Sequence, residues 1–227
     1  MNYLLLMGGE PSPVDAPLTY LILLLTVYTS YRYMEYGSGK VRLMFIPYEM
    51  QRNKEWYRFF SHGLVHNDWI HLLFNSYVLL MFGGMVEIYL KSDYLFGVMG
   101  NFVYLALYIS GLMMSSLYSY YKHKDNRGYA ALGASGAVSS VVFAFILLAP
   151  TSSMGLIFIP RIHFPAVFFG LAYLAYSAYM SKRNLDNVGH DAHYWGSVWG
   201  FVFLAALKPL LLYAFFLEIK LYLSSLF

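Results

Sequence analysis

Ser135 and His193 are the two side chains whose types and surroundings best suit covalent chemistry. Each stands among small residues at the start of an apolar run, Ser135 in Gly-Ala-Ser-Gly and His193 in Ala-His-Tyr-Trp-Gly. A serine hydroxyl becomes a useful nucleophile when a base within hydrogen-bond reach takes its proton. Histidine takes such a proton near neutral pH. The pair therefore predicts acyl transfer, with Ser135 as nucleophile and His193 as general base.

Glycines beside both side chains would allow the two apolar runs to pack closely as helices. They are Gly133, Gly136, Gly196 and Gly200. Small residues at a membrane helix interface let two backbones approach closely. His193 and the last two glycines recur at i, i+3 and i+7, so they share one helix face. We expect that face to press against the start of the serine helix. The competing interpretations are packing alone for the glycines and an interfacial anchor for His193.

His71 and Asn75 suit a third part of such a site. They lie one turn apart at the start of another apolar run. Both side chains can donate hydrogen bonds to a developing oxyanion, as can the backbone N–H of Ser135. The sequence therefore predicts that these groups stabilise a tetrahedral intermediate.

A zinc site is the competing interpretation of the same stretch. His62, His66, His71 and Asp68 are residue types that bind zinc. Their spacing crosses the expected start of a helix and fits no common zinc pattern, so we expect no metal and no other cofactor. We interpret His66 instead as structural, bonding the loop backbone.

The composition indicates that the bilayer is the solvent of this chain. Of the 227 residues, 59% are hydrophobic and 12% are charged, whereas about 25% are charged in a soluble domain. The absence of cysteine excludes disulfides, thiolate metal sites and a cysteine nucleophile. No basic run interleaved with aromatic residues is present, so nucleic acid is not an expected partner.

Six apolar runs are long enough to suggest helices that cross the membrane in one domain, 1–227. They cover roughly 17–35, 71–90, 94–119, 134–149, 164–180 and 192–216. The expected fold is an all-α polytopic membrane protein. Residues 36–70 are too polar to span and too apolar for an ordinary loop, which suits a segment partly embedded at the interface. Residues 150–163 are expected to form an extended connector or a re-entrant piece.

Run length and parity indicate where Ser135 and His193 lie. The run 134–149 would span about 24 Å as a helix, less than the hydrocarbon core of about 30 Å. Ser135 would then start several Å below the surface if the far end reaches the opposite interface. With six spans, the connections before Ser135 and before His193 lie on the same side as 36–70.

In these motifs the chain resembles the rhomboid intramembrane serine proteases over roughly residues 55–205. The motifs occur in order as Trp56-Tyr-Arg58…His62…His66…His71-x-x-x-Asn75, then Gly133-Ala-Ser135-Gly136, then Ala192-His193-x-x-Gly196-x-x-x-Gly200. The resemblance implies a six-helix bundle with a partly embedded first loop and a serine–histidine dyad without a third acid. It implies that His71 and Asn75 bind the oxyanion and that Arg58 belongs to the first loop.

One position departs from the family pattern. Some relatives place an aromatic residue one turn after the serine, under the imidazole, and here that residue is Ser139. Something else must then hold the ring of His193. His190 is a rival base, although the glycine pattern selects His193. Asp186 and Asp191 lie near in sequence, and neither is assigned as a triad member.

The resulting prediction is an intramembrane serine endopeptidase whose partners are transmembrane protein substrates and the lipid bilayer. A catalytically inactive relative that binds and routes transmembrane helices is the alternative. A transporter with a histidine path would need more charges inside its helices. The expected location is multi-pass in a membrane, the plasma (inner) membrane if the source is bacterial. The positive-inside rule places the catalytic side in the cytoplasm, whereas the resemblance places it outside, and we favour the latter. The oligomeric state stays open.

Overall fold

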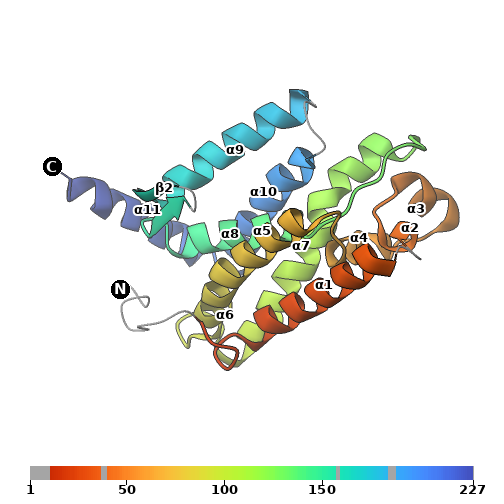
Figure 1. Cartoon of the computed structure of the whole chain (residues 1–227). Coiled ribbons are helices and arrows are strands. Elements are labelled where there is room, and N and C mark those ends of the chain that lie inside the picture. The colour runs from red at the N-terminus through yellow and green to blue at the C-terminus, as the bar shows by residue number, and fades with distance from the viewer. Residues whose placement is uncertain (1–10, 37–39, 157–158, 184–187, 227) are drawn as a thin grey trace.

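The computed structural model describes residues 11–36, 40–156, 159–183 and 188–226, which form a bundle of helices with one small hairpin (Figure 1). The first helix is followed by a loop of short helices: α1 (Pro17–Tyr36), α2 (Lys40–Leu43), α3 (Pro47–Asn53), α4 (Arg58–Ser61) and η2 (His62–Leu64). The next two long helical stretches are α5 (Trp69–Val78), η3 (Leu79–Gly83) and α6 (Gly84–Lys91), then η4 (Gly97–Met99) and α7 (Gly100–His123). The remaining elements are α8 (Ser135–Leu148), β1 (Ser153–Leu156), β2 (Ile159–Pro165), α9 (Ala166–Arg183), α10 (His190–Leu207) and α11 (Leu210–Ser224).

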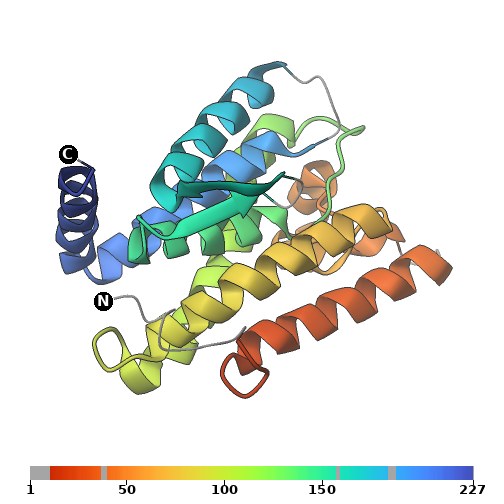
Figure 2. The same ribbon diagram turned by 60° about the vertical axis from the view of Figure 1, so that its left-hand side comes forward.

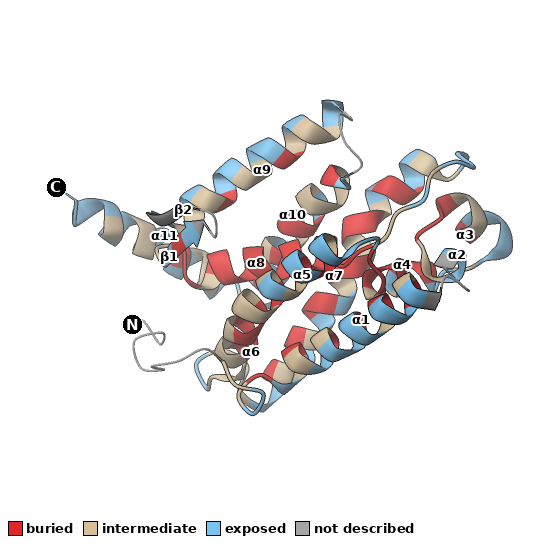
Figure 3. Cartoon of the chain, in the orientation of Figure 1, coloured by how far each residue is buried: buried red, intermediate tan, exposed pale blue. Residues whose placement is uncertain are grey.

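Helix α8 is the centre of the bundle. Every residue from 136 to 147 is buried, and Figure 3 shows the helix largely in red. Its sequence carries no charge and is apolar on all sides, which is typical of a helix enclosed by others. Helices α7 and α10 pack directly against it, and α9, α5, η3, α6 and α11 also contact it. At 14 residues it is only about 21 Å long.

Helix α1 is attached to the bundle by a buried carboxylate. Glu87 of α6 is fully buried and accepts hydrogen bonds from the backbone N–H of Leu18 at 3.0 Å and of Thr19 at 2.8 Å. The first N–H groups of a helix have no partner within the helix, so an anion there satisfies them and complements the helix dipole. The Thr19 hydroxyl bonds both Glu87 and the hydroxyl of Tyr104, which ties α1, α6 and α7 together. Figure 2 shows α1 running beside α5 and α6.

Length and hydropathy mark two of the described helical stretches as able to cross a membrane. These are Trp69–Lys91 and Gly97–His123, and a third arises if α10 and α11 count as one bent span. Many large apolar side chains on the outside of the bundle are exposed, such as Leu24, Leu73 and Phe102. An apolar exterior of this kind suits lipid as the surrounding medium. The chain is a mostly helical membrane protein.

Two stretches differ from the elements expected from the sequence. The run 192–216, expected as one helix, is two helices with an angle of 113° between them. Pro209 explains the break, because proline lacks an N–H and disfavours a helical conformation in the residue before it. Lys208 is accordingly non-helical, with φ −141° and ψ 80°. The expected connector forms the antiparallel hairpin β1–β2, in which Met154 pairs with Phe164.

Candidate active site

Ser135 is the first residue of α8 and is half-buried. Its N-cap is Ala134, which supplies no side-chain cap to the helix. The N–H groups of the first turn therefore point out of the helix start, where its dipole is positive. This arrangement can stabilise negative charge that develops next to the Ser135 hydroxyl.

The residues before Ser135 are clamped to the first loop. The N–H of Gly133 donates to the carbonyl of His62 at 2.9 Å, and the ring N–H at Nδ1 of His62 donates to the Gly133 carbonyl at 3.2 Å. Gly133 has φ +111°, a left-handed conformation that favours glycine. A Cβ there would also lie 2.7 Å from Cε1 of His71. Gly133 thus permits both the turn into α8 and the close approach of His71.

His66 fixes the orientation of Asn75. Nε2 of His66 accepts from the Ala134 N–H at 3.4 Å and lies 2.9 Å from Nδ2 of Asn75. A backbone N–H is only a donor, so Nε2 is the acceptor and Asn75 must present its NH₂ group to it. Nδ1 of His66 then carries the proton and donates to the Ser30 hydroxyl at 3.0 Å. One N–H of Asn75 remains for another acceptor.

The structure brings the predicted oxyanion donors together with the segment before the predicted nucleophile. His66 and His71 meet edge to face, with ring centroids 4.9 Å apart, and Ala134 is the immediate neighbour of Ser135. Burial in the loop between α1 and α5 lowers the pKa of His66 to about 3, which keeps it neutral. Ser30 was not expected to take part, because nothing in its own sequence surroundings points to His66.

The start of α10 lies against the start of α8. A Cβ on Gly196 would overlap the Gly136 carbonyl and lie 2.9 Å from its carbon atom, and a Cβ on Gly200 would overlap the Ser140 carbonyl. The Ser140 hydroxyl donates to the Gly196 carbonyl at 2.8 Å, which joins the two helices at this level. The glycine face of α10 therefore packs on α8 next to Ser135, and His193 begins that face.

His193 is flanked by rings from two helices. Tyr173 of α9 lies nearly parallel to it, with centroids 6.2 Å apart and planes at 23°. His190 meets it edge-on at 5.8 Å and 79°. Asp191 binds Lys122 of α7 at 2.9 Å and accepts a hydrogen bond from the Ser181 hydroxyl of α9. Asp186 lies outside the described residues.

Arg58 is buried and holds the first loop together. Its Nε pairs with Glu55 at 2.6 Å, and one guanidinium nitrogen donates to the carbonyls of Val41 and Met44 at 2.5 and 2.7 Å. These contacts close the chain between α2 and α4 into one folded unit. Arg58 thus stabilises the fold of the first loop.

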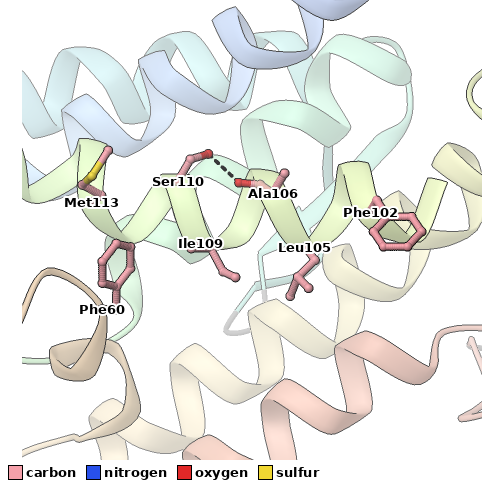
Figure 4. Close-up of a pocket in the computed structure, with 7 residues that line it drawn as sticks. All are labelled: Phe60, Phe102, Leu105, Ala106, Ile109, Ser110 and Met113. Atoms are coloured by element: carbon pink, nitrogen blue, oxygen red, sulfur yellow. Dashed lines mark hydrogen bonds between the residues drawn. The ribbon is translucent and has the colours of Figure 1, made fainter. Parts of the chain in front are cut away.

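Metal binding has no candidate cluster within the described part of the chain. No group of three or more histidine, cysteine, aspartate or glutamate side chains gathers there. Both nitrogens of His66 are already used in the hydrogen bonds described above. A cavity of about 410 Å³ lies elsewhere, along α7 (Figure 4). Its lining is mostly apolar and comprises Phe60, Phe102, Leu105, Ala106, Ile109, Ser110 and Met113.

Helix α8 begins with Ser135, is buried among apolar helices and packs against the glycine face of α10. These features define the class of the protein as an integral membrane protein with a candidate serine–histidine site. Comparison with known proteins gives the family. A family model described as the rhomboid domain matches residues 53–209, well over half of the chain. The chain belongs to the rhomboid family.

Two relatives show how far this likeness extends. Presenilin-associated rhomboid-like protein A, mitochondrial, of Danio rerio is 33% identical over 102 residues, which are 44% of this chain and 24% of that protein. Rhomboid protease GlpG of Haemophilus influenzae is 27% identical over 161 residues, which are 70% of this chain and 76% of that protein. The chain thus matches about a quarter of the first relative and most of the second.

Proposed function

We propose that this chain is an intramembrane serine endopeptidase that cleaves transmembrane segments of membrane proteins. The observation that carries the proposal is the direct backbone contact between the starts of α8 and α10, at Gly136 and Gly196. It brings the helix that begins with Ser135 against the helix that carries His193. The similarity to the Haemophilus influenzae protein, a rhomboid protease, supports the same activity.

The proposed reaction proceeds through an acyl-enzyme. The Ser135 oxygen attacks the peptide carbonyl carbon while His193 takes the hydroxyl proton. The tetrahedral oxyanion accepts hydrogen bonds from His71, the remaining N–H of Asn75 and the Ser135 backbone N–H. His193 then gives its proton to the leaving amine as the C–N bond breaks. A water molecule, deprotonated by His193, hydrolyses the ester and regenerates Ser135.

The substrate that fits this site is a transmembrane helix. Its backbone is fully hydrogen-bonded in lipid, so it must unwind locally before a peptide carbonyl is open to attack. Small or helix-breaking residues near the membrane surface favour that step. The reaction requires that water reach Ser135 from the side of the first loop, which in this proposal is partly embedded in the membrane. The six spans of the proposal are α1, α5–α6, α7, α8, α9 and α10.

The proposed location is a multi-pass integral membrane protein, in the plasma (inner) membrane if the source is bacterial. The side that bears the first loop and Ser135 faces outward. No cofactor is required, because the serine, the histidine and the oxyanion donors account for each proton and charge in the reaction.

Purified protein in liposomes tests this function with two readouts. We expect a fluorophosphonate to label the parent, and the parent to cut single-span reporter substrates, whereas Ser135→Ala does neither. Loss of a serine-protease nucleophile costs on the order of 10⁶-fold in rate. Thermal unfolding of Ser135→Ala should match the parent, since only a hydroxyl is removed. Cleavage by Ser135→Ala would refute the serine mechanism, and a folded parent with neither label nor cleavage would favour the inactive, helix-binding alternative.

A further inference from the structure

The imidazole of His193 needs a partner that holds its plane, and α8 does not supply an aromatic one at the expected place. The residue one turn after Ser135 is Ser139, which is buried. A serine is too small to support a ring across a helix interface. The support must come from a side chain that the sequence alone does not single out among 23 tyrosines.

Tyr173 of α9 has the required position. Its ring lies 6.2 Å from that of His193 with planes 23° apart, within the range of offset stacking between aromatic rings. Its hydroxyl lies 3.1 Å from the Ser139 hydroxyl. The phenol therefore reaches from α9 to the same residue of α8 where the family pattern leads one to expect a ring.

Other rings hold Tyr173 itself in place. Phe169, one turn earlier on α9, lies 6.2 Å away at 14°, and Phe143 of α8 lies 6.2 Å away at 42°. Phe143 is buried. Contacts with α8 and with its own helix thus fix the position of the Tyr173 ring. A ring held in this way can restrict the orientation of the His193 imidazole that stacks on it.

We infer that Tyr173 is the positioning residue for His193, with Ser139 anchoring its hydroxyl, and that the two together replace an aromatic residue on α8. The inference rests on the proposed function, because it assigns Tyr173 a role toward His193 as base. It adds that the base is aligned only while α9 is packed against α8 and α10. Tyr173 makes no contact with the reacting atoms in this scheme.

Four variants in liposomes test the inference through kcat and KM for a reporter substrate. Tyr173→Leu should lower kcat about tenfold or more with little change in KM, since a misplaced catalytic group costs up to about 10²-fold per Å. Tyr173→Phe should stay within about fivefold of the parent, because it keeps the ring and loses only the hydrogen bond. The exchange Ser139→Tyr with Tyr173→Ser should recover most of the loss. Tyr179→Leu is the matched control, an exposed tyrosine on the same helix whose ring packs on Arg183.

Thermal unfolding of each variant separates positioning from folding. If Tyr173→Leu is unfolded, Tyr173→Met takes its place, since methionine fills irregular space well. A folded Leu or Met variant with the parent's kcat would overturn the positioning role. An exchange variant no better than Tyr173→Leu would overturn the claim that the α9 ring substitutes for one on α8. A parent that cleaves while Tyr173→Leu also cleaves at full rate refutes only this inference, whereas a folded parent that never cleaves refutes the proposed function.

Discussion

Asn75 and His71 can assist the proposed reaction only if both donate hydrogen bonds to the same oxyanion. The neighbouring residues set the orientation of these donors. The structure gives Asn75 a fixed NH₂ orientation through His66. We predict that His71→Ala and Asn75→Ala each lower kcat without abolishing cleavage. One oxyanion donor is worth about 10²–10³-fold in a soluble protease, and here several donors share the charge, so each loss should be at or below that range.

Steady-state kinetics on the reporter substrate check this prediction. Asn67→Ala is the matched control, because Asn67 is an exposed asparagine just before α5, the helix that carries His71 and Asn75. Asn75→Ala also removes a hydrogen bond to His66, so its thermal stability must be compared with the parent. Unchanged kcat in both folded variants would show that these side chains do not face the oxyanion.

His62 makes the stability of the first loop, between α1 and α5, sensitive to acid. It lies between α4 and α5, and burial lowers its pKa to about 4 from the ordinary value of about 6.5. Between these values the unfolded chain binds a proton that the folded chain does not, so stability must fall as pH falls below about 6.5. The slope for one such group is about 1.4 kcal/mol per pH unit.

Thermal unfolding in detergent between pH 7.5 and 5 measures this effect, in a window above the titration of most carboxylates. We expect His62→Phe to lose its stability less steeply on acidification than the parent. The variant keeps a ring against Phe45 but loses the hydrogen bond to Gly133, so we expect it to be less stable than the parent at neutral pH. The quantity to compare is therefore the slope of stability against pH, not the stability itself. Equal slopes for parent and variant would mean that His62 is not a neutral buried group in the fold.

Single residues also show where sequence reasoning stops. The motifs single out Ser135, His193, His71 and Asn75 because their types and spacing are unusual among apolar neighbours. Tyr173 and Ser30 have no such signal: one is a tyrosine in a tyrosine-rich helix, the other a serine on α1. Their contacts with His193 and His66 arise only when three helices have packed.

At the scale of elements, the packing of α10 on α8 depends on the absence of two side chains. We predict that Gly196→Ala and Gly200→Ala lower both cleavage and thermal stability. Their Cβ atoms would overlap the carbonyls of Gly136 and Ser140, so α10 must move outward. A shift of about 1 Å can cost on the order of 10²-fold in rate, and overpacking typically costs about 1–3 kcal/mol.

Gly189→Ala is the control for this pair. It precedes α10, and the nearest side-chain atom to its added Cβ is 3.8 Å away. It should therefore keep the parent's cleavage rate and stability, which isolates the effect of the α8 contact. Full activity and stability in both α8-facing variants would remove the structural basis for placing His193 near Ser135.

Elements were predictable from the sequence to different degrees. Charged breaks and long apolar runs located most helices, because a bilayer demands long apolar segments. The sharp turn between α10 and α11 also had a signal in Pro209, which argues against one helix over 192–216. The β1–β2 hairpin had none, since its register depends on pairing that a short mixed segment does not specify.

At the scale of the whole molecule, the distribution of basic residues bears on which way the protein faces. Eleven of the 15 Lys and Arg residues fall on the proposed catalytic side of a six-span bundle, which the positive-inside rule assigns to the cytoplasm. That rule counts charges in short, free loops. Several of these charges are bound within the fold: Arg58 is buried, Arg127 donates to the Tyr48 hydroxyl at 2.9 Å, and Lys122 pairs with Asp191. These charges are therefore weaker evidence that the catalytic side faces the cytoplasm.

The orientation can be measured directly because the chain has no cysteine. We predict that Gln51→Cys and Asp125→Cys, at exposed positions in the first loop and before α8, react with a membrane-impermeant maleimide added to intact bacterial cells that express them. Asp93→Cys, exposed between α6 and α7, should react only after the cells are permeabilised, since one span separates it from each of the other two sites. Retained reporter cleavage by each variant shows that it is folded. The reverse pattern would place the catalytic side in the cytoplasm and uphold the charge rule. Reaction of all three from one side would show that α5–α6 and α7 do not both cross the membrane, and the six-span arrangement would fail with them.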